Sequence, residues 1–392
     1  MTATDPLALP DPRAFPDAAA APRDAAALYA TAQASLAAES GGHADALDRE
    51  ARAALGRMLA DDGAALAAIL AGSPSVAVAR HLWRLLDAAW QDAAGDGDAG
   101  LAVTVFALPL VIVAAVEAGR GERTLPGVLA APDKLVAILR EHRALCANRS
   151  VALGDALVAA GAIDVGALPQ LLQWQRLPDA HAPGGALPAR ELMPAPLALA
   201  AAGESVHLRF LVGSAIARNG VDLLADAKVG PWGAPFAREV SRQIGDGAAT
   251  VLALPRAPQR PLPAVWQGRL AQREVAAQIF ASNALRKLRA SVGEPTAIIS
   301  AHTAADAVQG GELRLSLSSP FEPRDAEGFR CPLYPQERVG DVAAMLTDLL
   351  RDCRVTDIRT LAGVHPDRDR GTGLPVLYKP DTIPPPAAAL VH

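Results

Sequence analysis

The residues best suited to chemistry gather late in the chain, in segments that follow apolar stretches. His302 and Asp306 stand in SAHTAAD, directly after the apolar stretch 296–301, and a helical turn there would place both side chains on one face. Loops after strand ends in α/β sheets often hold catalytic groups, so we take His302 and Asp306 as catalytic candidates. Two potential ligands are too few for a zinc site, and solvated loop residues are the alternative.

Cys331 is the third catalytic candidate. It lies in EGFRCPLYPQERV, which we expect to be a proline-flanked loop, beside Arg330. A neighbouring cation lowers the pKa of a thiol and makes it more reactive. A nucleophilic thiol also needs a base in space, and His302 or His365 would have to supply it. The alternative is a packed and unreactive thiol.

Three residues are candidates for binding an anion: Arg330, His365 and Arg370. The last two stand in GVHPDRDRGTGLP, where the backbone N–H groups of a glycine-rich turn can wrap an anion. The segment lacks both the GxGxxG and the P-loop patterns, and an exposed turn is the alternative. No pattern in the sequence predicts a bound metal or a cofactor.

Binding to nucleic acid is not expected. Basic residues do load the stretch 263–290, at Arg269, Arg273, Arg286, Lys287 and Arg289. Around a helix they do not form one stripe, and 5 Trp, 3 Tyr and 7 Phe leave few rings for stacking on bases. The net charge of −5 is also far from that of a dedicated nucleic-acid binder.

Composition places the chain among folded globular proteins. Of its 392 residues, 51% are apolar and 20% are charged. The abundance of Ala and Arg and the scarcity of Lys are typical of a GC-rich bacterial genome. Three isolated cysteines without CxxC spacing favour reduced thiols, and the N-terminus lacks the pattern of a signal peptide. We therefore expect a soluble, cytoplasmic protein.

The most apolar stretch, GLAVTVFALPLVIVAAV, raises the question of a membrane span. As a helix, residues 101–116 would extend roughly 24 Å, short of the ~30 Å hydrocarbon layer. Pro109 stands at its centre, and β-branched residues are frequent. We expect a buried extended segment that Pro109 breaks into two short strands, with a kinked core helix as the alternative and no membrane span.

The N-terminal half is expected to be mainly helical. After a flexible leader, 1–24, apolar residues keep helical spacing over 47–59 and 78–89, and Pro132 can open another helix. Shorter helices are expected over 151–160, with Gly161 as its stop, and over 168–177. The stretch LGDALVAAGAIDVGALPQLL resembles the small helical N-terminal module of secretion-type traffic ATPases, but no phosphate-binding motif follows, and no function is carried over.

The C-terminal half changes to an α/β pattern. We expect a Pro/Ala-rich linker, 178–204, between a helical domain, 25–177, and an α/β domain, 205–378, before a tail, 379–392. Strands are predicted near 206–210, 249–254, 296–301, 311–318 and 355–361, and helices at 235–244, at 263–290 and from Asp341 as N-cap. From residue 249 the order is β-α-β-β-α-β, a possible ferredoxin-like unit.

In GELRLSLSS the leucines alternate with Glu312, Arg314 and Ser316, so we expect these polar residues to face water. The fold class is therefore mixed α/β. Two functions follow from these observations. The first is a non-catalytic binding or assembly protein, with a protein partner or a second copy, to which the strand at 312–318 could add a partner strand if it lies at an edge. The second is an enzyme of unrecognised family that acts on an anionic small molecule or phosphoester through the strand-end loops.

Overall fold

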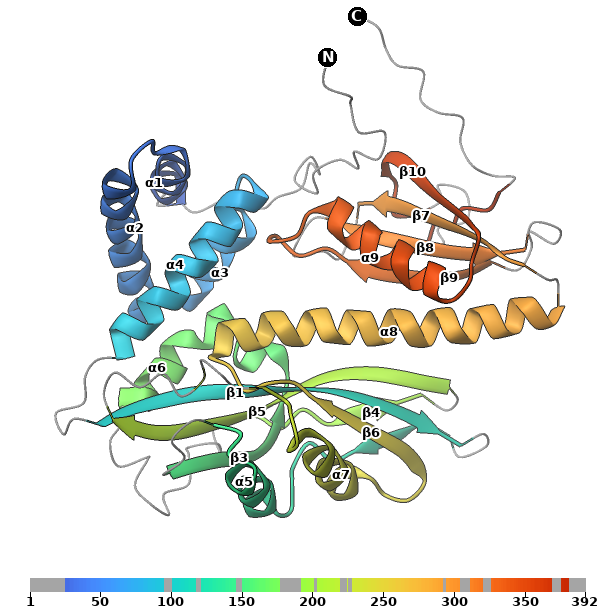
Figure 1. Cartoon of the computed structure of the whole chain (residues 1–392), viewed down its shortest axis with the longest axis horizontal. Coiled ribbons are helices and arrows are strands. Elements are labelled where there is room, and N and C mark those ends of the chain that lie inside the picture. Colours follow the sequence, from blue (N-terminus) through green and yellow to red (C-terminus); the bar gives the residue numbers. More distant parts are fainter. Residues whose placement is uncertain are drawn as a thin grey trace, which may run out of the picture. The chain divides into compact units, whose positions relative to one another are not determined.

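The chain is a mixed α/β protein, as its sequence predicted (Figure 1). The computed structural model describes residues 25–94, 101–117, 121–145, 150–176, 192–200, 203–218, 224, 228–291, 294–303, 311–319, 326–368 and 375–380. The predicted leader lies outside these residues, and the predicted linker and tail are described only in part.

The chain packs into two compact units. The C-terminal unit comprises residues up to 33, 68–82 and everything from 277, and the central unit comprises 34–67 and 83–276. Some helices contribute to both units: α1 (Ala25–Ala37), α3 (Gly63–Ala71), α4 (Val76–Ala94) and α8 (Pro261–Ser291). The predicted helices within 47–59, 78–89 and 263–290 are confirmed.

The central unit is built on a four-stranded antiparallel sheet in the order β3-β5-β1-β6. Its elements are α2 (Gly41–Asp61), β1 (Leu101–Val116), β2 (Arg123–Leu125), α5 (Pro132–Glu141), β3 (Ser150–Val158), the short 3₁₀ turns η2 (Ala160–Ala162) and η3 (Val165–Ala167), α6 (Leu168–Arg176), β4 (Leu197–Leu199), β5 (Gly203–Arg218), α7 (Gly233–Ile244) and β6 (Ala249–Pro255). Pro132 stands at the start of α5, as predicted, because its missing N–H needs no partner there.

The apolar run is strand β1, so the expected buried extended segment is confirmed. It pairs with β5 over its whole length of 16 residues and with β6 over residues 110–116. Both faces are covered, which is why the run shows no alternation of polar and apolar residues. Among the described residues, no helix is both long and apolar enough to cross a membrane.

Pro109 does not break β1, so that part of the prediction is wrong. The Pro109 carbonyl accepts a hydrogen bond from the Arg256 N–H at 2.8 Å. The nitrogen of Pro109, which has no hydrogen to donate, therefore also lies on the side of β6. There the ladder stops at Pro255 and resumes with the reciprocal pair of Ala107 and Gln259. The interruption therefore occurs in the pairing with β6, while the ladder to β5 continues.

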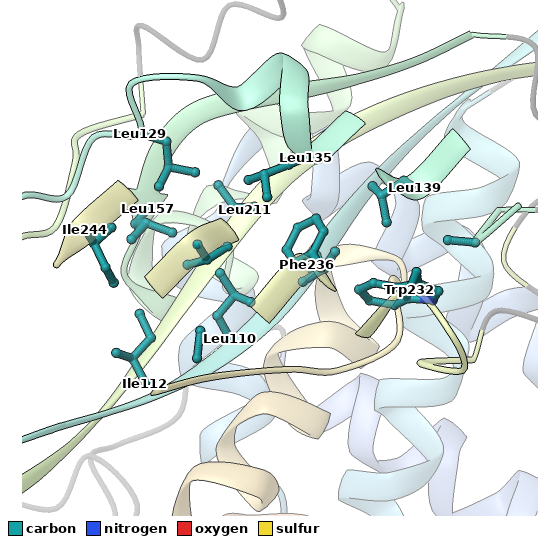
Figure 2. Close-up of a cluster of buried hydrophobic side chains, with 14 of the residues drawn as sticks. Leu110, Ile112, Leu129, Leu135, Leu139, Leu157, Leu211, Trp232, Phe236 and Ile244 are labelled. Atoms are coloured by element: carbon teal, nitrogen blue, oxygen red, sulfur yellow. The ribbon is translucent and has the colours of Figure 1, made fainter. Parts of the chain in front are cut away.

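Helices α5 and α7 cover one face of this sheet and bury its main core. Figure 2 shows side chains of the strands meeting those of the two helices, among them Leu110, Ile112, Leu211, Leu135, Leu139, Phe236 and Ile244. Trp232, just before α7, packs edge-on against Phe236 with ring centroids 5.4 Å apart. Phe106 lies over Gly213 of the paired strand, where a Cβ atom would come within 2.4 Å of the Phe106 ring. Glycine is thus required at residue 213.

The C-terminal unit holds a second four-stranded sheet in the order β10-β7-β8-β9. Its elements are β7 (Thr296–His302), β8 (Glu312–Ser318), β9 (Ala326–Pro332), α9 (Val339–Asp352) and β10 (Asp357–His365). β10 runs parallel to β7, and the other pairs are antiparallel. Leucines of β8 pack with apolar residues of α8 and α9 in one core, which includes Leu313, Leu315, Leu317, Leu285, Leu346 and Leu350.

The polar face of β8 is buried, so the expectation that it faces water is wrong. Glu312, Arg314, Ser316 and Ser318 are at most 4% exposed. β8 lies between β7 and β9 rather than at an edge, and the C-terminal segment (residues 366–368 and 375–380) contacts this face. Leu377 of that segment lies against Gly328 of β9, where a side chain would leave no room.

Three further predictions are corrected. Residues 150–158 form strand β3 instead of a helix ending at Gly161, because pairing with β5 outweighs the local helix preference of an Ala-rich stretch. The β-α-β-β-α-β unit is wrong, since β6 belongs to the other sheet and β9 replaces the expected loop around Cys331. Asp341 lies inside the first turn of α9, and Arg338 holds the N-cap position.

Candidate functional site

The structure brings together some of the candidate site residues. His302 ends β7 and His365 ends β10, and parallel pairing places them side by side with ring centroids 5.6 Å apart. Cys331 lies on β9 opposite Leu313, buried in the apolar core on the other face of the sheet. Asp306 and Arg370 lie outside the described residues, so their predicted roles stay predictions.

The two histidines lie side by side because the register between β10 and β7 shifts. In the pairing of β10 with β7, Thr360 lies opposite Ile299, but Val364 lies opposite Ala301. The extra residues include Gly363, whose φ of +84° lies in the left-handed region that glycine adopts without strain. The bulge thereby advances His365 to a place beside His302.

Each ring nitrogen of His302 has a partner. Nδ1 lies 2.9 Å from the carbonyl oxygen of Pro366, which can only accept, so Nδ1 carries the proton and donates. Nε2 lies 2.7 Å from Ser300 Oγ and accepts from that hydroxyl when the ring is neutral. Burial is the main reason that the pKa of His302 falls to about 4, and the positive charge of Arg314 also lowers it. The imidazole is thus neutral at physiological pH.

His365 and Tyr378 complete an aromatic cluster with His302. The Tyr378 hydroxyl and His365 Nδ1 are hydrogen-bonded at 2.8 Å, and their rings meet edge to face at 4.9 Å. Burial lowers the pKa of His365 and raises that of Tyr378. His365 Nε2 is buried and has no hydrogen-bond partner among the described residues.

Arg314 is the centre of a buried ionic network on the same face of the sheet. Its guanidinium donates to Glu312 at 2.5 Å, to the Asp367 carboxylate, and to the carbonyl oxygens of Asp367 and Val376. Arg330 donates to both carboxylate oxygens of Glu312, at 3.0 and 2.8 Å. Burial alone would raise the pKa of Asp367, but its bond to Arg314 and the surrounding arginines hold it below the ordinary value.

The aromatic cluster and the ionic network hold the C-terminal segment on the sheet. They are poorly suited to be a reactive centre. A serine bonded to an oriented histidine is the arrangement of an activated nucleophile, yet Ser300 and His302 both have 0% exposure. A histidine with a pKa of about 4 is also a weak base at neutral pH. Within the described part of the chain, no group of three or more His, Cys, Asp or Glu side chains could hold a metal ion.

An accessible site lies in the central unit, between α7 and β6. The groove there has a volume of about 670 Å³ and is lined by residues 229 and 230, by residues 233, 234, 237, 238 and 241 of α7, and by residues 251–256. Small side chains of α7 leave it open, and Leu252 projects from β6 with 51% of its surface exposed. Arg238 and Arg256 are the charged residues among its described lining.

Sequence reasoning missed both the groove and the buried ionic network. The groove carries no motif, because it is formed by small residues of a helix beside a strand edge. For the network there was a signal: Glu312 and Arg314, of opposite charge and two residues apart on a strand, lie on the same face and can pair there.

Comparison of the chain with models of protein families, with curated proteins and with solved structures finds no match. Any function must therefore be inferred from the geometry of these two sites.

Proposed function

We propose that the chain is a non-catalytic binding protein that holds a segment of a protein partner in the groove between α7 and β6. The observation that carries this proposal is the apolar groove itself, which lies beside β6, the last strand of its sheet among the described residues. Its volume of about 670 Å³ falls within the usual range for ligand-binding clefts.

The lining of the groove suits a polypeptide. Val251, Leu252 and Leu254 supply apolar surface, and the more exposed of them, Leu252, gains most from being covered. Ala234 and Ala237 on the facing helix leave space for the side chains of a partner. Because Leu252 is 51% exposed, covering the rest of its side chain contributes about 0.8–1.5 kcal/mol to binding before the entropic cost of association.

An enzyme acting on an anionic small molecule has less support. That role would use His302, Asp306 and Cys331; the side chains of His302 and Cys331 have no exposed surface, and Asp306 lies outside the described residues. A bacterial cytoplasmic setting is part of the proposal, and it is supported by the sequence, in which the three cysteines are isolated and show no CxxC spacing.

The proposal is tested by filling the groove with a larger side chain and measuring peptide binding. A display library of short random peptides is selected on the intact chain, and bound peptides are then measured against Ala237→Trp. Ala237 is partly exposed, so the larger side chain occupies the groove without entering the core. Ala198→Trp, at an exposed residue of β4 away from the groove, is the matched control.

We expect selected peptides to bind the native chain and Ala198→Trp alike, and to bind Ala237→Trp at least tenfold more weakly. If Ala237→Trp does not fold, Leu252→Glu at an exposed residue replaces it. Equal binding to the filled and open grooves, or no selected peptide, overturns the proposal.

A further inference from the structure

A second groove in the central unit lies between helices α2 and α4. It has a volume of about 600 Å³ and shares no described residue with the groove beside β6. Two ion pairs join the helices, Arg84 with Asp48 at 3.0 Å and Arg52 with Asp92 at 3.1 Å, and so hold the two walls together. The described lining comes from both helices: Arg49, Arg52, Ala53, Gly56, Arg57, Ala89, Asp92 and Ala93.

Small residues supply the apolar part of this lining. They stand three or four residues apart on each helix, Ala53 and Gly56 on α2 and Ala89 and Ala93 on α4, so each pair lies on one helix face. Gly56 is inside α2, where glycine destabilises a helix relative to alanine. A Cβ atom at Gly56 would meet nothing within 4 Å, so packing inside the chain does not require glycine there. The space over Gly56 is open to another molecule.

The arginines give the groove a positive charge that its lining does not balance. Asp92 is the acidic residue among the described lining, and it is paired with Arg52. Arg49 donates from Nε to the carbonyl oxygen of Asp45 at 3.3 Å, which is an uncharged acceptor. The Arg57 guanidinium has no hydrogen bond or ion pair within the described residues. Arg49 and Arg57 can therefore each accept a carboxylate from a partner.

The separation of these two charges favours one kind of anion. Arg49 and Arg57 are eight residues apart, about 12 Å along α2, and the pair of Arg52 with Asp92 lies between them. A polyphosphate has adjacent charges, which would come close to the Asp92 carboxylate. Two separate carboxylates match the arginines and leave Asp92 with its partner. On a helix, residues seven apart lie on one face, about 10 Å apart.

We propose that the groove between α2 and α4 binds an acidic helix of a protein partner, two carboxylates of which, about two turns apart, are held by Arg49 and Arg57. A third helix packs into the groove between two others, and the small residues of the lining let its backbone come close. This surface is additional to the groove beside β6, and the inference does not rest on the function proposed for that groove.

The experiment compares three fluorescein-labelled peptides of about 20 residues, rich in alanine so that they form helices. The first has two Glu residues seven apart on the alanine face, the second has the same two Glu residues side by side, and the third has Gln in place of both. Binding to the full chain is measured by fluorescence polarisation at low ionic strength, where exposed charge pairs are least screened.

We expect the native chain to bind the first peptide at least fivefold more tightly than the second or the third, because each exposed ion pair adds only modestly to affinity. Arg49→Gln/Arg57→Gln should lose this preference. The matched control is Arg286→Gln/Arg351→Gln, which removes two charges at exposed residues outside the groove, and it should keep the preference.

A second pair of variants tests the shape of the groove. Gly56→Leu places a side chain in the open space and should weaken binding of the first peptide at least fivefold. Gly42→Leu, at an exposed residue of the same helix where a Cβ atom also meets nothing within 4 Å, should bind it as the native chain does. Both variants should fold, since leucine is a better helix former than glycine.

Equal binding of the first and second peptides overturns the inference, because net charge alone would then decide affinity. Unweakened binding by Gly56→Leu, or no binding of the first peptide, overturns it as well. Tripolyphosphate that binds more tightly than the first peptide, and loses affinity in Arg49→Gln/Arg57→Gln, would assign the groove to a compact anion instead. Ala237→Trp should bind the first peptide as the native chain does; if it does not, the peptide lies beside β6 and this inference fails while the proposed function gains support.

Discussion

Acid should loosen the C-terminal unit through His302. This imidazole is neutral in the folded protein because burial lowers its pKa to about 4, whereas the unfolded chain binds the proton near pH 6.5. Between these values the unfolded state holds more protons, so stability falls as pH decreases from about 6.5 to about 4 and is fully present above that window. Burial also lowers the pKa of His365, so this residue likewise makes the folded protein less stable as pH decreases.

The magnitude follows from the shift. Each pKa unit corresponds to about 1.4 kcal/mol, so a decrease from pH 7.5 to 4.5 should cost the folded unit about 2–3 kcal/mol through His302 alone. Asp367, whose pKa is lowered, contributes stability that is lost only below about pH 3.8. A measurement that stops at pH 4.5 therefore separates the histidines from this carboxylate.

The assay is the reactivity of the Cys331 thiol, which is buried on the other face of the same sheet. Labelling with dithiodipyridine, with peptide mapping to distinguish the three cysteines of the chain, reports how often the sheet opens. After correction for intrinsic reactivity in the unfolded chain, labelling of Cys331 should rise roughly 50- to 100-fold from pH 7.5 to 4.5.

His302→Gln should lose most of this response, because the amide does not titrate, and the remainder should come from His365. His43→Gln, at an exposed residue of α2, should keep the native response. The reasoning is refuted if Cys331 labelling shows the same pH dependence in His302→Gln as in the native chain, or no dependence in either.

Two other substitutions test the packing. Gly213→Ala places a Cβ atom 2.4 Å from the Phe106 ring and should destabilise the central unit by about 1–3 kcal/mol, measured by urea unfolding followed through tryptophan fluorescence, because all five tryptophans of the chain belong to the central unit; an unchanged midpoint would mean that the ring moves freely aside. Arg314→Met leaves the buried Glu312 carboxylate and its partners without their central cation and should cost about 3–5 kcal/mol, whereas Arg314→Lys should cost less. Thermal unfolding of the C-terminal unit checks this, and equal melting of Arg314→Met and the native chain would contradict it.

Elements with strong local periodicity were predictable. The stripes of α2, α4 and α9 come from apolar residues three and four apart, and the signal depends on nothing outside each segment. The same holds for β1, whose unbroken apolar run indicated a strand covered on both faces. By contrast, β3 has apolar residues compatible with either period, and its pairing with β5 decided the outcome.

The candidate site was predictable only in part. His302 was identified because it follows an apolar strand, and that position is local information. Its meeting with His365 depends on parallel pairing and on the bulge at Gly363, which joins residues far apart in the chain. Cys331 went to the opposite face because a strand alternates its side chains, and β9 was taken for a loop.

The sequence by itself determined the mixed α/β class, the principal helices and the burial of the apolar run, because periodicity and apolar content act within each segment. Only the tertiary structure decided which face of β8 is buried, which side of Pro109 lacks a partner, and which residues of α7 and β6 line the groove. Each of these depends on what packs against a residue, and its neighbours come from distant parts of the chain.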